Sequence, residues 1–425
     1  MTPRRARRAF GAALFLGLVA PSCTERRAMP NTTTQQSPNA NILPAPLAST
    51  AELPGATGAS SPTAMDSAHA VAGDPEQPPE PAPEDRPLPA DPVGARDLAG
   101  YTLDGSFRWT DAPPIATGPD VPSNLKELAS ALELKVVVDL APAGRMRFAF
   151  ESDAFPLPVH SELRARTGYF GHVLVWADAT AYRVVPPGSL RALFAERRAD
   201  VSPLLRATVR PAGNGYLLGH RTVHTELETS LGVLVLEQAT VAGAGSGELL
   251  CRLLVELIGA EPANDACRPE RVPLSAQYRW AGGGTIAFAA TALGERKDPA
   301  GTSLAVPPEG ARWAVGELPP SPTALLTTPE LARFRARPIR AAVPNARVTE
   351  GVTFDNETNL VEYLFLDGVP VLWLRPHSRE HLLGPPAGRY QVAFRDFFGT
   401  AVTPPSVMEL PALLRVGAPE PDAGK

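Results

Sequence analysis

The stretch "RMRFAFE" (residues 145–151) decides the fold class, because its large apolar side chains fall on every second residue. Met146, Phe148 and Phe150 alternate with charged or small residues. A period of two is typical of a β-strand with one face in the core and the other in water. The stretch therefore predicts a half-buried strand of an antiparallel sheet.

Similar stretches lie on both sides of it: "KVVVDLA", "HVLVWAD", "AYRVVP", "GVLVLEQA", "VPLSAQYRW" and "TIAFAATAL", separated by Gly, Pro and Asp. Helical spacing of apolar residues is found at 123–134, 189–198 and 246–262. We therefore expect an α+β domain, mostly antiparallel β, over residues 98–319. Residues 320–340 are expected to form a linker with a short helix.

The C-terminal part contains "NLVEYLFLDGVPVLWLRP" (359–376), two strand-like runs around Asp367-Gly368, which is a strong hairpin signal. A further strand follows in "GPPAGRYQVAFRDFFG" (384–399). This order of turns and strands resembles the PEGA family of small envelope β-domains, with "GPPAGRY" in place of Pro-Glu-Gly-Ala. The resemblance covers roughly residues 354–399 and implies a non-catalytic module. We expect an all-β domain over 341–416 and a disordered tail at 417–425.

The chain has 425 residues, of which 44% are hydrophobic and 20% charged, and 48 are proline. Its formal net charge of -5 and its scattered arginines give no basic stripe, so we expect no nucleic-acid partner. Proline, alanine, serine and glutamate dominate residues 23–97. That composition predicts a disordered acidic tether, because few large apolar residues are present to offset the entropy of ordering.

Residues 1–22 have the layout of an export signal, with the basic "MTPRRARRAF" before the apolar "GAALFLGLVA" and then "PSC". The segment resembles a bacterial lipoprotein signal. That resemblance implies a lipid on Cys23 that holds the protein in a membrane, and Thr24 after it implies the outer membrane. The alternatives are ordinary secretion with a free Cys23, or an uncleaved anchor.

The two other cysteines, Cys251 and Cys267, are expected to form a disulfide, since export places them in an oxidising compartment. The short segment between them makes closure of the loop cheap in entropy. The alternative is a buried free thiol at Cys251, because the helix predicted around it is apolar on nearly every face.

The stretch "PHSREH" (376–381) matches the His-x-x-Glu-His spacing of a zinc hydrolase, in which two histidines bind the metal. A zinc-binding helix needs several turns, and the flanking prolines and glycine leave room for about two. We favour an exposed loop or short strand. His220 and His224 fall in a predicted strand, where residues four apart are ~13 Å apart and cannot share a metal.

Other short motifs also favour structural roles. Ser123 and Lys126 match Ser-x-x-Lys, but its companion motifs are missing, so Ser123 is interpreted as a helix N-cap. Ser246 lies in "GAGSG", which is out of register for Gly-x-Ser-x-Gly. The glycines of "AGGGT" (281–285) precede no helix and are interpreted as a hairpin turn.

The sequence therefore predicts no catalytic, cofactor-binding or metal-binding residues. The favoured function is a non-catalytic lipoprotein of the cell envelope that binds a protein or glycan partner or has a structural role. The alternative is an envelope hydrolase whose active site lies in the central domain without a local motif.

Overall fold

The computed structural model describes residues 87–89, 91, 99–111, 123–131, 133–152, 157–168, 171–195, 202–263, 265–296, 301–314, 319, 321–334 and 348–417. The predicted signal peptide, Cys23, most of the predicted tether and all but one residue of the predicted tail lie outside this set. Within the set, no helix is long and apolar enough to cross a bilayer.

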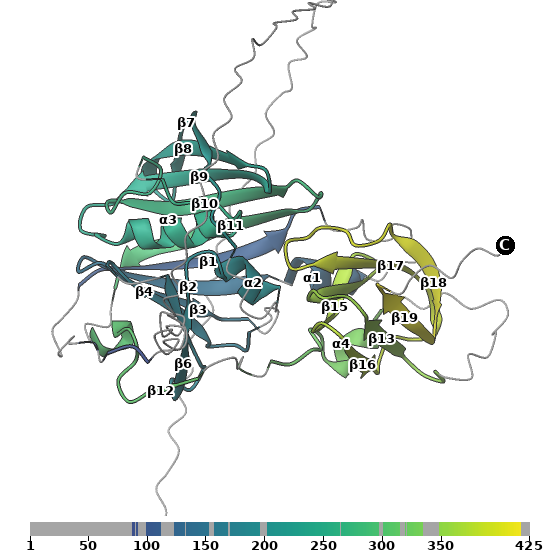
Figure 1. The fold of residues 1–425 in the computed structure, drawn as a ribbon. Helices are drawn as coiled ribbons and strands as arrows, with labels where there is room; N and C mark the ends of the chain where they lie inside the picture. The colour runs from purple at the N-terminus through teal and green to yellow at the C-terminus, as the bar shows by residue number, and fades with distance from the viewer. Residues whose placement is uncertain are drawn as a thin grey trace, which may run out of the picture. The chain divides into compact units, whose positions relative to one another are not determined.

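The central part is a single sheet of 12 strands in the order β12-β6-β5-β4-β3-β2-β1-β11-β10-β9-β8-β7 (Figure 1). Its strands are β1 (Tyr101–Trp109), β2 (Leu134–Ala141), β3 (Arg145–Phe150), β4 (Glu162–Arg166), β5 (His172–Val175), β6 (Ala181–Val185), β7 (Thr208–Leu217), β8 (His220–Thr229), β9 (Gly232–Thr240), β10 (Arg271–Trp280), β11 (Thr285–Glu295) and β12 (Arg312–Trp313). Neighbouring strands are antiparallel except β12 and β6, which are parallel. The sheet is thus the mostly antiparallel structure expected from the alternating sequence.

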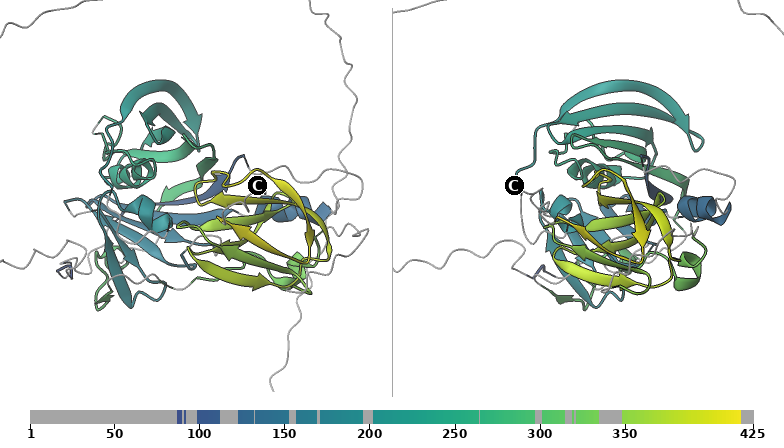
Figure 2. Two further views of the ribbon diagram at one scale, coloured as in Figure 1. Left: turned by 45° about the vertical axis from the view of Figure 1, so that its right-hand side comes forward. Right: turned by 90° about the vertical axis from the view of Figure 1, so that its right-hand side faces the viewer.

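Two helices pack on the apolar face of this sheet. The first is α2 (Leu190–Phe194), and the second is α3 (Gly247–Glu256), over which β7, β8 and β9 arch (Figures 1 and 2). The buried Tyr278 of β10 donates its hydroxyl hydrogen to the Leu254 carbonyl oxygen of α3, at 2.9 Å. A helix apolar on most sides is stable here because it is covered on most sides.

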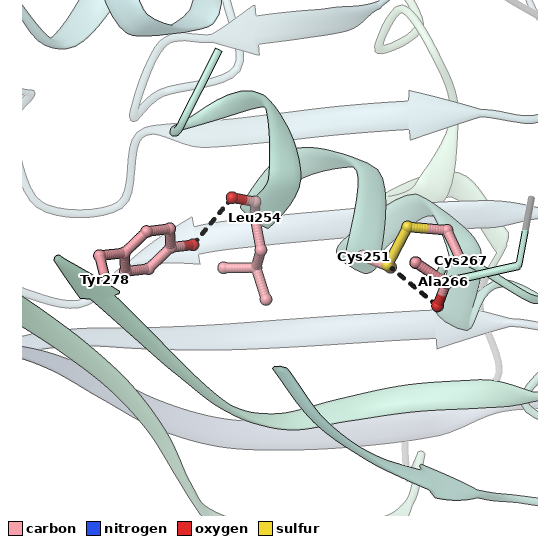
Figure 3. Close-up of a disulfide and its surroundings, with 5 residues drawn as sticks. All are labelled: Cys251, Leu254, Ala266, Cys267 and Tyr278. Atoms are coloured by element: carbon pink, nitrogen blue, oxygen red, sulfur yellow. Dashed lines mark hydrogen bonds between the residues drawn. A yellow bond between two sulfur atoms is a disulfide. The ribbon is translucent and has the colours of Figure 1, made fainter. Parts of the chain in front are cut away.

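The structure joins Cys251 of α3 to Cys267 by a disulfide, with the Cα atoms 5.4 Å apart (Figure 3). The bond connects α3 to the segment that leads into β10. Both cysteines are buried, at 0% and 6% exposure.

The C-terminal part has two sheets. The strands are β13 (Val352–Asn356), β14 (Glu362–Leu366), β15 (Val369–Leu374), β16 (Ser378–Leu382), β17 (Gly388–Asp396), β18 (Ser406–Leu410) and β19 (Ala412–Val416). They form the sheets β16-β13-β19 and β15-β14-β17-β18. The turn between β14 and β15 is Asp367-Gly368, with φ of 47° and 83°, as its hairpin signal predicts.

Segments from elsewhere in the chain complete this C-terminal core. Leu125 of α1 (Ser123–Ala131) and Leu331 of α4 (Thr328–Leu331) are both fully buried in it. The sequence places α1 within the stretch expected to form the central domain, but its apolar face packs on the C-terminal part instead. A helix's own pattern predicts that a face is buried, not which surface covers it.

The central and C-terminal parts share one apolar cluster. Trp109 of β1 packs against Tyr363 and Phe365 of β14, with ring centroids 5.0 and 5.8 Å apart. Phe194 of α2 stacks on Phe397 at 4.6 Å. Strand β14 is therefore buried on both faces.

Candidate functional site

A pocket of about 290 Å³ lies between α2, the end of α3 and the C-terminal sheets. Its walls are mostly apolar, formed by Leu204, Leu231, Leu360, Val361, Phe397 and Phe398. Three charged side chains also line it: Arg191, Glu256 and Asp396. An apolar cavity with a few converging polar groups is the usual form of a small-molecule site. We call it the interface pocket.

Arg191 is held in place at the wall of this pocket. It projects from α2, and its guanidinium carbon lies 4.0 Å from the centroid of the Phe398 ring. The same guanidinium donates through Nη1 to the Leu257 carbonyl oxygen at 3.1 Å. Stacking and hydrogen bonding together fix the direction of this positive charge.

Glu256 is the last residue of α3 and is only 5% exposed. Its Oε2 atom has no hydrogen-bond partner within the described residues. The Nε2 atom of His172, a residue of β5 that is 3% exposed, lies 3.6 Å from that oxygen. A buried oxygen without a hydrogen bond is costly, so this oxygen has capacity for a donor.

Asp396 ends β17 on the other wall. Burial raises the pKa of its carboxyl, while the Thr400 N–H, which donates to Oδ1 at 2.8 Å, and Arg191 both oppose that rise. Glu362 of β14 is paired directly opposite Asp396 in the sheet. Burial, together with the Asp396 charge, raises the pKa of Glu362 to about 8.

A second hollow of about 660 Å³ lies along the charged face of β1 to β4, opposite the apolar core. Arg147 donates to Glu162 at 2.6 Å and to Asp139 at 3.0 Å. Arg164 donates to Glu162 at 2.7 Å, and the Thr102 hydroxyl donates to Asp139 at 2.7 Å. We call this hollow the charged groove. Its buried charges neutralise one another.

The same face is covered by the end of the predicted tether. The Asp91 side chain, 1% exposed, forms ion pairs with Arg145 and Arg166 and accepts the Val306 N–H at 2.8 Å. The sequence prediction that this face of β3 is solvated is therefore wrong. Alternation correctly identified the polar side chains, but ion pairing allows them to be buried under another segment.

The histidines of the zinc-like motif do not lie on a helix. Residues 378–382 form strand β16, consistent with the favoured interpretation. His381 Nδ1 is 2.9 Å from the Thr353 hydroxyl, and His377 Nε2 is 2.8 Å from the Asn359 side-chain oxygen. Each histidine thus has its own separate partner.

His220 and His224 lie in strand β8, as predicted, and His224 Nε2 is 3.2 Å from Glu237 Oε1 across the β8–β9 pair. Throughout the described ranges, no three His, Cys, Asp or Glu residues are placed to hold a metal ion.

The other motif residues have local structural positions. Ser123 begins α1, and the fully buried Ser246 directly precedes α3. Gly283 and Gly284, with φ of 94° and 86°, form the turn between β10 and β11, as predicted.

Sequence reasoning did not single out the three charged residues of the interface pocket. One signal was available: Glu256 is a carboxylate that interrupts an apolar run, with Leu253-Leu254-Val255 before it and Leu257-Ile258 after it. Arg191 and Asp396 are far apart in the sequence, and only the packing of the two parts brings them to one cavity.

No protein-family model matches the chain. No curated protein matches it either. Several solved structures align with it at low similarity. One is a MucA/MucB complex of Pseudomonas aeruginosa, with 10% identity, a TM-score of 0.25, and 49% of this chain and 56% of that chain covered. The chain thus spans little more than half of that protein.

Two other solved structures also align with the chain at low similarity. PNGF-II has 9% identity and a TM-score of 0.29, with 51% of this chain and 31% of that chain covered. An outer membrane lipoprotein-sorting protein domain, described as putative, from Vibrio parahaemolyticus has 7% identity and a TM-score of 0.23, with 47% and 86% covered. TM-scores this low assign neither a fold nor a function.

Proposed function

We propose that the protein is a non-catalytic binding protein of the cell envelope and that its ligand occupies the interface pocket. The observation that carries the proposal is the pocket itself, an apolar cavity of about 290 Å³ between two parts of the chain. Ligand sites are found preferentially at such junctions. The export-type N-terminus, the predicted tether and the lipid expected on Cys23 support a position in the envelope.

The mostly apolar lining of the pocket supports a binding role. A hydrolase needs a base or nucleophile in contact with its substrate. His172 is 3% exposed and contacts Glu256 without being part of the lining. The arrangement can hold a ligand, but it does not place this imidazole against one.

The test uses N-phenyl-1-naphthylamine, an uncharged dye whose fluorescence rises in apolar sites. We expect saturable binding to the purified full chain. Ser202→Trp and Leu360→Trp, which add bulk on opposite walls of the pocket, should each weaken binding by at least about ten-fold.

Thr208→Trp is the matched control, because Thr208 is exposed, lies a few residues beyond Ser202 and does not line the pocket. It should leave dye binding unchanged. If both pocket variants bind the dye as the unsubstituted protein does, the pocket is not the binding site and the proposal fails.

A further inference from the structure

We infer that the interface pocket selects a ligand with a positively charged amine and a small apolar body, and that Glu256 receives the amine. This inference rests on the proposed binding function and adds the chemical class of the ligand. It is drawn from the position, burial and unsatisfied hydrogen bonding of one carboxylate, and from the charges of its neighbours.

The first step concerns Glu256 itself. It lines the pocket, is 5% exposed, and its Oε2 atom has no hydrogen-bond partner within the described part of the chain. The Nε2 atom of His172 lies 3.6 Å from that oxygen, beyond hydrogen-bond distance, whereas an ammonium group beside the carboxylate would supply charge and donors together. A ligand amine would therefore match the charge and the accepting oxygens of Glu256.

The second step is the balance of charge in the pocket. Two carboxylates, Glu256 and Asp396, face one guanidinium, Arg191. Arg191 is stacked on Phe398 and hydrogen-bonded to the Leu257 carbonyl oxygen, so its position is fixed. The lining thus has more acidic than basic side chains, with the His172 imidazole behind Glu256, and this composition favours a cationic ligand over an anionic one.

The third step concerns size and the rest of the lining. A cavity of about 290 Å³ is at the lower end of the range for small-molecule sites. Leu204, Leu231, Leu360 and Val361 supply apolar walls, and Phe397 adds an aromatic one. A ring or short alkyl chain bearing one amine matches both the space and the surface.

The experiment is a displacement series at pH 7 with three molecules of similar size and different charge. Phenethylamine is cationic, 2-phenylethanol is neutral and 3-phenylpropionate is anionic. Each is titrated against the full chain carrying bound N-phenyl-1-naphthylamine. We expect phenethylamine to displace the dye at a concentration at least about ten-fold lower than either analogue, as a charge-assisted hydrogen bond requires.

Two variants separate the charge from the shape. Glu256→Gln keeps the shape of the side chain and removes its charge. In this variant the concentration of phenethylamine needed for displacement, relative to that of 2-phenylethanol, should rise by about ten-fold. Urea unfolding of the variant, compared with that of the unsubstituted protein, shows whether the variant is folded. Glu248→Gln, in the first turn of the same helix and outside the pocket, is the control and should bind all four molecules normally.

The outcomes distinguish this inference from the proposed function. If the pocket-filling tryptophans abolish dye binding but the anion or alcohol displaces the dye as well as the amine does, the binding function stands and the amine preference is wrong. An unchanged amine affinity in Glu256→Gln would overturn the role of that carboxylate. If the dye does not bind in the pocket at all, the proposed function itself fails.

Discussion

The charged groove and the interface pocket both contain buried charges, but they satisfy them differently. In the groove, Arg147 bridges Asp139 and Glu162 at hydrogen-bond distance. At the pocket, Glu256 has an oxygen without a hydrogen bond, and Glu362 nearby has another, both within the described residues. Paired buried charges compensate one another, whereas a buried carboxyl oxygen without a hydrogen bond costs free energy and marks a candidate site for a ligand or a switch. Groups of identical chemistry therefore indicate different roles.

The largest expected effect is a pH dependence of the free energy of unfolding that arises from Glu362, near the interface pocket. The folded state holds the Glu362 proton up to about pH 8, whereas the unfolded chain releases it near 4.5. The raised pKa therefore stabilises the folded state fully below about pH 4.5, and this stabilisation is lost as pH rises to about 8. The loss is about 1.4 kcal/mol per pH unit, or on the order of 5 kcal/mol in all.

Glu362→Gln removes this titration. Urea unfolding at pH 5, 6, 7 and 8 should show the variant gaining on the unsubstituted protein at each step. Glu380→Gln, on the exposed part of β16, should show no such trend. A constant difference between Glu362→Gln and the unsubstituted protein across the range would mean that Glu362 titrates alike in both states.

The second prediction removes the central ion pairs of the charged groove. Arg147→Met removes the guanidinium that neutralises Asp139 and Glu162 and leaves both carboxylates buried beside fewer donors. Such a loss should lower the free energy of unfolding by about 3 kcal/mol. Dye binding in the interface pocket should be unchanged, since the groove is a separate hollow.

The control for this change is Arg389→Met. Arg389 pairs with Glu409 at 3.3 Å, but both side chains are well exposed, at 53% and 41%. Water screens such a pair, so its loss should cost less than about 1 kcal/mol. Equal effects of the two substitutions on urea unfolding would contradict the structural role assigned to the groove.

The third prediction concerns the disulfide, which constrains the helix that brings Glu256 to the pocket. Changing both Cys251 and Cys267 to alanine should lower the free energy of unfolding by about 2 to 3 kcal/mol, because the unfolded chain loses a short closed loop. Alkylation of the purified protein without reductant, followed by peptide mass analysis, should find neither cysteine modified. Modification of both would show that the bond does not form.

The fold was predictable where one stretch of sequence determines one element. The alternation at 145–150 gave β3, and Asp367-Gly368 gave a two-residue hairpin, because both are local preferences of the chain. The packing of α1 against the C-terminal part was not predictable, since Leu125 indicates a buried face without its partner. The interface pocket could not be predicted from the sequence for the same reason, because it forms only when the packing brings Arg191 and Asp396 together.

The last prediction leaves the charged groove and the interface pocket intact and tests only whether the protein is anchored in a membrane. If Cys23 carries lipid, its acyl chains hold the protein in a membrane, because each buried CH₂ contributes about 0.8 kcal/mol to membrane binding. The predicted tether then separates the acyl chains from the folded part. Cys23→Ala should then move the protein to the soluble fraction or block its processing. Its urea unfolding and its affinity for N-phenyl-1-naphthylamine should not change, because Cys23 precedes the first described residue by a long stretch of predicted tether. A substituted protein that is processed yet still sediments with membranes would show that the folded part binds the membrane itself. That result would overturn the lipid anchor while leaving the contrast between groove and pocket untouched.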